Sequence, residues 1–195
     1  MNDDIKNFLN HYIKLPNRLI STFEKLVTYT ELEPNEVFTK VGEHPSNFFI
    51  VKTGIMRSYL LNNSGTETTR AFFTSGDITG ANSAMMQEIP SEVNYQALTK
   101  VTGYKGNFRE LIKLTLKHHE FSLFYIKTLE SAYVKAEDIL LKISSLTATE
   151  RYLVLKKRIP NIDDLITQKY IASYLNISPV QLSRIKKKLI VDKLS

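Results

Sequence analysis

The stretch that decides the fold of the C-terminal part is TQKYIASYLNISPVQLSRIKKKL, residues 167–189. It carries the signals of two short helices separated by a tight turn at Asn176, a residue type that tolerates positive φ. Thr167 is placed to cap the first helix. Ser178, Pro179 and Gln181 mark the start of the second helix, as cap, first helical residue and capping-box partner. This order predicts a helix-turn-helix, a motif whose second helix enters the major groove of DNA.

The second helix has an apolar face and a basic face. Leu182, Ile185 and Leu189 recur at helical spacing and should pack inward. On the outer face Arg184 should read a base, because its planar fork matches guanine O6 and N7, and some of Lys186 to Lys188 should contact phosphates. The residues predicted to contact DNA are Thr167, Gln168, Lys169, Ser178, Pro179, Val180, Gln181, Ser183, Arg184, Lys187 and Lys188.

An ordinary helical hairpin with a solvated lysine face is the alternative interpretation of this stretch, and the charge distribution argues against it. Residues 147–195 hold ten of the 26 Lys and Arg residues and four of the 20 Asp and Glu residues. The first 146 residues therefore hold 16 of each sign, and the whole net charge of +6 lies in the last quarter of the chain. Such asymmetry indicates a polyanionic partner, in this case double-stranded promoter DNA.

The composition excludes several classes of protein. A chain of 195 residues with 43% apolar and 24% charged residues is typical of a globular protein. The absence of an 18-residue apolar run and of a signal peptide favours a cytoplasmic protein without membrane contact. With no cysteine, disulfides and cysteine-ligated zinc or iron–sulfur clusters are impossible. The four histidines lack ligand geometry and no catalytic constellation is present, so we expect no metal, no cofactor and no enzyme activity.

The first part of the chain changes from helix to short strands. Helical spacing covers residues 3–13, and Pro16 can open a second helix that runs through Val27. Short β-type runs then follow at 37–41, 47–52, 54–61, 66–73 and 95–107, with a hairpin signal in Asn62-Asn63-Ser64-Gly65. Residues 77–86 suggest a strand end and a short helical turn. Several short strands at regular spacing predict a small β-barrel or jelly roll.

Helix returns at residues 108–116, and a longer helix is predicted at 118–144. A heptad pattern runs along this longer helix. A seam of this length more often pairs with its twin than lies alone, although packing on its own domain is the alternative. We expect a homodimer, because paired half-site recognition also requires one. The predicted seam consists of Tyr125, Leu129, Ala132, Ala136, Ile139 and Ile143.

A β-roll, a long heptad helix and a terminal helix-turn-helix, in this order, resemble the Crp/Fnr family of bacterial transcription regulators. The similarity covers nearly the whole chain. The residues that carry it are FIVKTG at 49–54, SGDITG at 75–80, and IASYL at 171–175 with Leu182-Ser183-Arg184. The resemblance implies a homodimer that binds a roughly palindromic promoter site, contacts RNA polymerase and uses the β-roll as a sensor or contact platform.

Two departures from the family pattern matter. Cyclic-nucleotide-binding members have Gly-Glu at the start of the phosphate cassette and an Arg about ten residues later, whereas here Ala81 follows Gly80 and no Lys or Arg occurs between Arg70 and Lys100. A buried phosphate without a cationic partner is costly, so we expect no response to cyclic AMP. The β-hairpin wings of the family also look reduced or absent. The degenerate effector pocket would comprise Gly80, Ala81, Asn82, Ser83, Ser91 and Glu92.

The sequence therefore predicts an α+β protein with three parts. Residues 1–116 form a double-stranded β-helix, or jelly-roll, sensor domain; residues 117–146 form a dimerisation helix and hinge; residues 147–195 form an all-helical helix-turn-helix domain. We expect a DNA-binding transcription regulator of unknown effector. The alternative is a small-molecule-binding regulatory module whose basic C-terminal domain docks an acidic protein.

Overall fold

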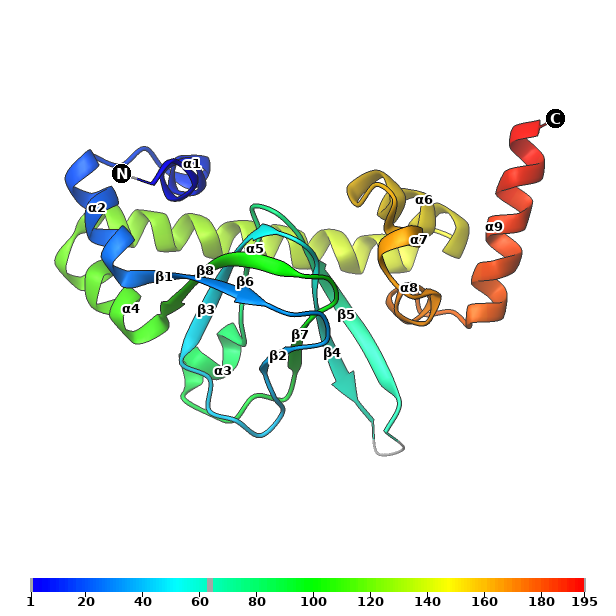
Figure 1. Ribbon diagram of the computed structural model, residues 1–195, viewed down its shortest axis with the longest axis horizontal. Helices are drawn as coiled ribbons and strands as arrows, with labels where there is room; N and C mark the ends of the chain where they lie inside the picture. Colours follow the sequence, from blue (N-terminus) through cyan, green and yellow to red (C-terminus); the bar gives the residue numbers. More distant parts are fainter. Residues whose placement is uncertain (1, 63–64, 195) are drawn as a thin grey trace.

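The computed structural model describes residues 2–62 and 65–194. Figure 1 shows a β-roll in the middle of the molecule, N-terminal helices at one end and C-terminal helices at the other, with one long helix running behind all three. None of the described helices is long and apolar enough to cross a membrane. The mixed fold predicted from the sequence, a jelly roll followed by a helical region, is confirmed.

The β-roll consists of two four-stranded antiparallel sheets, in the orders β1-β8-β3-β6 and β2-β7-β4-β5. Their facing surfaces bury aromatic and aliphatic side chains such as Phe49, Met56 and Val101. Strand β5 is therefore an edge strand, hydrogen-bonded within its sheet only to β4. The strands are β1 Val27–Leu32, β2 Val37–Thr39, β3 Asn47–Thr53, β4 Met56–Leu61, β5 Glu67–Phe73, β6 Ile78–Thr79, β7 Asn94–Ala97 and β8 Val101–Asn107.

Two sequence predictions in this domain need correction. Val27 does not end a helix but begins β1, where it pairs with Gly106, because the β-branched and aromatic run that follows favours strand. The predicted strand at 95–107 is interrupted where the chain turns past Gly54, whose φ is +86°. A Cβ at Gly54 would lie 2.3 Å from the Lys100 carbonyl oxygen, so only glycine fits this approach. Of the predicted hairpin turn, Asn63 and Ser64 lie outside the described residues, but β4 and β5 do pair antiparallel.

An aromatic core fastens the long helix to the N-terminal end of the roll. Phe121 and Phe124 are fully buried in it, and the ring of Phe124 meets those of Phe8 and Phe23 edge to face at 6.1 and 5.7 Å. The first turns of the long helix are thereby held rigidly. The helices that meet here are α1 Asp3–Tyr12, α2 Asn17–Leu26, α4 Phe108–Lys117 and α5 His119–Ser145; the short α3 Asn82–Gln87 lies elsewhere, between β6 and β7.

The C-terminal domain begins with a capping box, in which Glu150 N–H donates to the Thr147 hydroxyl and the Glu150 carboxylate accepts from Thr147 N–H. Residues 148–194 as described contain helices and no strand, in agreement with the predicted reduction of the wings. The elements are α6 Ala148–Arg158, α7 Ile162–Leu165, α8 Gln168–Tyr174 and α9 Pro179–Leu194.

Helix α8 docks against the exposed edge of β5. The Ser173 hydroxyl accepts a hydrogen bond from Thr69 N–H at 2.9 Å and donates one to the Glu67 carbonyl at 3.2 Å. The rings of Phe72 and Tyr174 lie 4.9 Å apart. The edge strand is thus covered, which removes a site for strand pairing with other chains. The C-terminal helices share one apolar cluster with the β-roll.

Candidate nucleic-acid interface

The turn between α8 and α9 has the geometry that the sequence predicts. Asn176 has a φ of +55°. Ser178 and Gln181 form a capping box, with Gln181 N–H donating to the Ser178 hydroxyl at 3.2 Å and Ser178 N–H donating to the Gln181 side-chain oxygen at 2.9 Å. Thr167 occupies the N-cap position of α8, but its side chain makes no capping hydrogen bond, so that prediction is wrong. The start of α9 is therefore the more firmly defined of the two.

The two helices bury one face each and present the other to solvent. Ile171, Ala172, Leu175 and Leu182 are at most 1% exposed and form the core of the motif. All eleven residues that were predicted to contact DNA are exposed on α8, α9 or the segments before them: Thr167, Gln168, Lys169, Ser178, Pro179, Val180, Gln181, Ser183, Arg184, Lys187 and Lys188.

Lys186 differs from its neighbours, because it is tied to the interior of the domain. Its ammonium lies 2.9 Å from one carboxylate oxygen of Asp163 in α7. The other oxygen accepts a hydrogen bond from the Tyr152 hydroxyl at 2.6 Å and pairs with Lys156 at 3.2 Å. Lys186 therefore fastens α9 to α7. Some of Lys186 to Lys188 were predicted to contact phosphates, and of these Lys187 and Lys188 are exposed.

Asp163 binds three side chains of the C-terminal domain, those of Tyr152, Lys156 and Lys186. Burial alone would raise its pKa, but the hydrogen bond from Tyr152 and the pairs with Lys186 and Lys156 together lower the pKa below the ordinary 3.8. Burial and the nearby carboxylate raise the pKa of Tyr152, so its hydroxyl remains a proton donor. Asp163 is thus charged throughout the physiological range and holds α6, α7 and α9 together.

The cations outside this network form the candidate contact surface. Within the described residues, no ion pair engages Lys169, Arg184, Lys187 or Lys188. Arg151 differs, because its guanidinium donates to the carbonyls of Leu146 and Leu175 and so braces the hinge and the turn. These cations project from two helices that pack through a buried core, of which α9 is capped by Ser178 and Gln181. Such a surface can neutralise phosphates and place an arginine against base edges.

The predicted effector residues lie around α3, where three of them are buried. Ala81 and Ser91 are 3% and 2% exposed, and the Ser91 hydroxyl donates to the Val93 carbonyl at 2.8 Å. Ala81 packs with Ala84 and Tyr95, against Phe38, Phe73 and Val93. Gly80 has a φ of +150°, Asn82 and Ser83 begin α3, and Glu92 is exposed. The region forms an aromatic core rather than a polar cradle.

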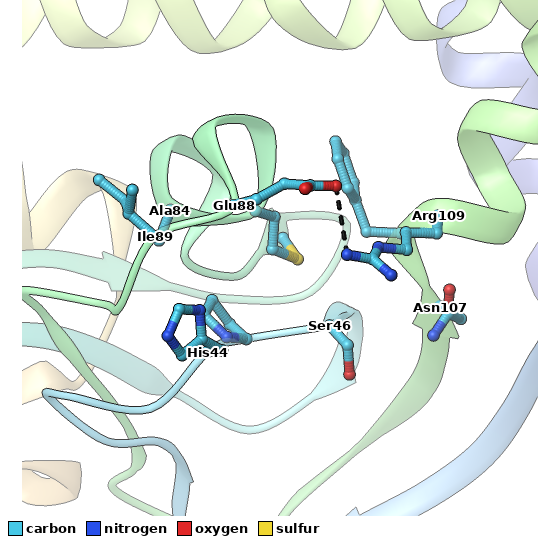
Figure 2. Close-up of a pocket in the computed structure, with 10 residues that line it drawn as sticks. His44, Ser46, Ala84, Glu88, Ile89, Asn107 and Arg109 are labelled. Atoms are coloured by element: carbon cyan, nitrogen blue, oxygen red, sulfur yellow. Dashed lines mark hydrogen bonds and ion pairs between the residues drawn. The ribbon is translucent and has the colours of Figure 1, made fainter.

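Two surface clefts are lined by residues of the β-roll and of the helices packed on it, and neither is lined by any predicted effector residue. Figure 2 shows the smaller, of about 390 Å³, with the Glu88–Arg109 ion pair at 3.2 Å across it and His44 and Ser46 beyond. The larger, of about 610 Å³, lies between α1, β3 and α5. No group of three or more His, Cys, Asp or Glu within the described residues could hold a metal ion.

The second half of α5 carries an uncovered apolar stripe. Tyr133 is 69% exposed and Leu140 is 66% exposed, and neither belongs to the predicted seam. The exposed stripe is therefore rotated around the helix relative to the predicted one. Tyr125, by contrast, turns towards its own domain, where its ring packs against Phe108, and Ile139 is partly buried. The exposed stripe steps by three and four residues through Ile126, Leu129, Tyr133, Ala136, Leu140 and Ile143, with Ala132 beside it.

Comparison with known proteins agrees with this architecture. Residues 29–118, the β-roll and the helix after it, match the protein family described as the cyclic nucleotide-binding domain. No curated protein sequence matches the chain. One structural neighbour is described as a transcriptional regulator of the crp/fnr family and another as a global regulator, so the predicted resemblance is confirmed at the level of fold.

Three solved structures illustrate the similarity. FixK2 from Bradyrhizobium japonicum has a TM-score of 0.72 and 20% identity, with 86% of each chain covered. A structure from Eubacterium rectale described as a transcriptional regulator of the crp/fnr family has a TM-score of 0.74 and 15% identity, covering 95% of this chain and 88% of that one. The c-di-GMP responsive global regulator CLP of Xanthomonas campestris has a TM-score of 0.69 and 14% identity, covering 92% and 94%.

Replacing Asp163 with Asn should destabilise the protein by about 2–3 kcal/mol at pH 7, since hydrogen bonds to a charged group at a largely buried site are lost. Folding lowers the pKa of Asp163, so the stabilisation by its carboxylate is complete above about pH 4 and disappears as the pH falls through the folded-state pKa. The free energies of unfolding of the two proteins should therefore become equal at low pH. Urea unfolding at several pH values measures this. The exposed neighbour Asp164→Asn is the control, and an equal loss in both variants would contradict the role of Asp163.

Proposed function

We propose that the protein is a dimeric transcription regulator of the Crp/Fnr type that binds promoter DNA through α8 and α9. The observation that carries this proposal is the outer face of α9, where Arg184, Lys187 and Lys188 stand exposed on a capped helix with no ion pair to any other described side chain. The fold of the chain supports the same conclusion, because its structural neighbours are regulators rather than enzymes.

The positions of these side chains along α8 and α9 support a separate role for each in this proposal. Val180, Arg184 and Lys187 share one stripe of α9, which enters the major groove, and Arg184 grips a guanine. Lys188 lies one helical turn after Arg184, nearer the end of α9, where the helix leaves the groove and approaches the DNA backbone. It therefore contacts phosphate. At the start of α8, Thr167, Gln168 and Lys169 contact the backbone of the same half-site.

A second copy of the chain covers the apolar stripe of α5 in this proposal. The stripe repeats at three and four residues, the spacing at which two helices pack along a seam. Helix α5 lies behind the β-roll, so its outward face is free for a partner (Figure 1). Two copies related by a two-fold axis would present two α9 helices to the two halves of a palindromic site, with RNA polymerase as the expected further partner.

The β-roll does not respond to cyclic AMP in this proposal, and its effector remains to be identified. The interior beside α3 is packed with Tyr95 and Phe73, and Ala81 follows Gly80 where the family pattern has an acidic residue. Burial raises the pKa of Tyr95, although Arg70 acts in the opposite direction, so this ring is neutral at physiological pH. A cyclic phosphate in this apolar setting would lose its hydration without gaining a paired cation.

Arg184→Ala should weaken binding to the selected duplex by about 1–3 kcal/mol and relax the preference at one base position in each half-site.

Lys188→Ala should weaken binding to the selected and scrambled duplexes about equally. It should also reduce the slope of the logarithm of the binding constant against the logarithm of the salt concentration by about one. Competition titrations at several salt concentrations separate the two effects. Equal weakening on both duplexes by Arg184→Ala would show that Arg184 contacts phosphate. If the unmodified protein shows no preference for any duplex, the alternative of an acidic protein partner gains support.

Leu140→Glu should convert the dimer into a monomer, because it places two carboxylates opposite each other in a seam that excludes water. The matched control is Leu141→Glu. Leu141 is 62% exposed, similar to Leu140, but points about 100° away around the helix. Sedimentation velocity at micromolar concentration distinguishes the species. If both variants dissociate, or neither does, the seam lies on another face of α5.

Titration of the protein with cyclic AMP in a calorimeter should give no binding tighter than micromolar, which corresponds to about −8 kcal/mol. The physical reason is the apolar packing around Ala81 and Tyr95 and the missing cassette arginine. A submicromolar dissociation constant would overturn this interpretation of the β-roll. Cyclic di-GMP, named for one structural neighbour, provides a second ligand for the same titration.

A further inference from the structure

Arg57 is a fully buried arginine at the place where the β-roll meets the C-terminal domain. Its side chain on β4 is 0% exposed. Nε and Nη2 donate to the Gln96 side-chain oxygen at 2.9 and 2.7 Å, and Nη2 also donates to the Glu67 carboxylate at 2.7 Å. Within the described residues, Nη1 has no hydrogen-bond partner. Burying a guanidinium is costly, so its presence at this junction calls for a reason beyond packing.

The guanidinium lies between two aromatic rings that belong to different domains. Its central carbon is 4.0 Å from the ring centroid of Tyr59, which is on β4, and 3.7 Å from that of Tyr170, which is on α8. A flat cation between two rings resists tilting of either ring, because the attraction depends on lying over the ring face. The hydrogen bonds to Glu67 and Gln96 hold the cation itself to the sheet. Tyr170 is therefore held at a defined angle.

The angle of Tyr170 determines where α9 points. Tyr170 lies in the middle of α8, and the buried contacts of Ala172 and Leu182 join α8 rigidly to α9. The covalent link to α5 is an extended segment at Leu146 and Thr147, which does not by itself set an orientation. Other contacts between the domains include the Ser173 bonds to β5, the Phe72–Tyr174 ring contact, and the hydrogen bond and ion pair of Arg158 with the Phe72 carbonyl and Asp77. Ile55 and Phe72 also share an apolar cluster with the C-terminal helices. Among these, the Arg57 stack is the one centred on a fully buried charge.

We propose that Arg57 is a positioning residue that sets the distance between the two α9 helices of a dimer, and hence the half-site spacing that the protein recognises. This inference rests on the proposed function. In a dimer held by α5, each C-terminal domain can move only by swinging on its own β-roll, so the stack that fixes α8 also fixes the separation of the recognition helices. DNA requires that separation to match one helical turn, about 34–36 Å. Arg57 touches no DNA and acts through Tyr170.

A spacing series tests this proposal. The probes are duplexes that carry two copies of the selected half-site with the central spacer lengthened or shortened by one to three base pairs, and a duplex with one half-site. A change of two base pairs rotates one half-site by about 70° around the DNA axis. The unmodified protein should prefer one spacing and bind at least about tenfold more weakly two base pairs away from it, since both halves can no longer be engaged together.

Arg57→Met removes the cation and keeps an unbranched side chain of similar length. This variant should bind the duplex with the preferred spacing about tenfold more weakly, so that its affinities for all spacings differ by no more than about threefold. Its affinity for the single half-site should stay within about twofold of that of the unmodified protein. Tyr170→Leu tests the same stack from the side of α8 and remains informative if Arg57→Met does not fold. The control is Tyr170→Phe, because the Tyr170 hydroxyl makes no hydrogen bond within the described residues and the ring is retained.

The outcomes are distinguishable. If Arg57→Met and Tyr170→Leu keep the sharp spacing profile of the unmodified protein, the positioning role is wrong while the proposed function stands. If they lose single half-site binding to the same extent as paired binding, Arg57 supports only the stability of the domain, and the inference is again overturned. If the unmodified protein itself binds no paired site in preference to a scrambled duplex, it is the proposed function that fails.

Discussion

The structure depends on α5, whose first half packs in the core and whose second half is mostly exposed to solvent. Phe121 and Phe124 hold the start of α5 in the aromatic core beneath α1 and α2, so the remaining turns project at a fixed angle. At 27 residues the helix is about 40 Å long. It is therefore long enough to carry an apolar stripe for a second copy beyond the core and to deliver the C-terminal domain to the far side of the β-roll (Figure 1).

Some cations of the C-terminal domain form ion pairs within the protein, and others do not. Lys186 and Lys156 are paired with Asp163, and Arg158 reaches the β-roll at Asp77, so these cations hold helices together and join the domains. Lys169, Arg184, Lys187 and Lys188 are left to solvent. Net charge counted from the sequence does not separate the groups, because a paired and an unpaired lysine contribute equally to it. The cations without an ion pair among the described residues are the ones that we expect to displace the counterions of DNA.

Much of the fold could be predicted because its signals are local. The helix periodicity at 171–189, the Ser178–Gln181 box and the positive φ of Asn176 depend on neighbouring residues alone. The error at Val27 is a local one, because the run from Val27 to Leu32 itself favours strand. Other features depend on a distant partner: Lys186 turns inward because α7 brings Asp163 beside it. The Arg57–Tyr170 stack joins residues more than a hundred positions apart, and no pattern near either residue indicates it.

Hydroxyl-radical footprinting of the full chain on its selected duplex tests the central claim most directly, because it reports where the protein sits on the DNA without altering any residue. A dimer that reads DNA with two α9 helices should protect the backbone around two successive major grooves on one face of the duplex, with centres about 10–10.5 base pairs apart. Protection of a single groove, or a footprint that tracks the minor groove without this repeat, would contradict the account.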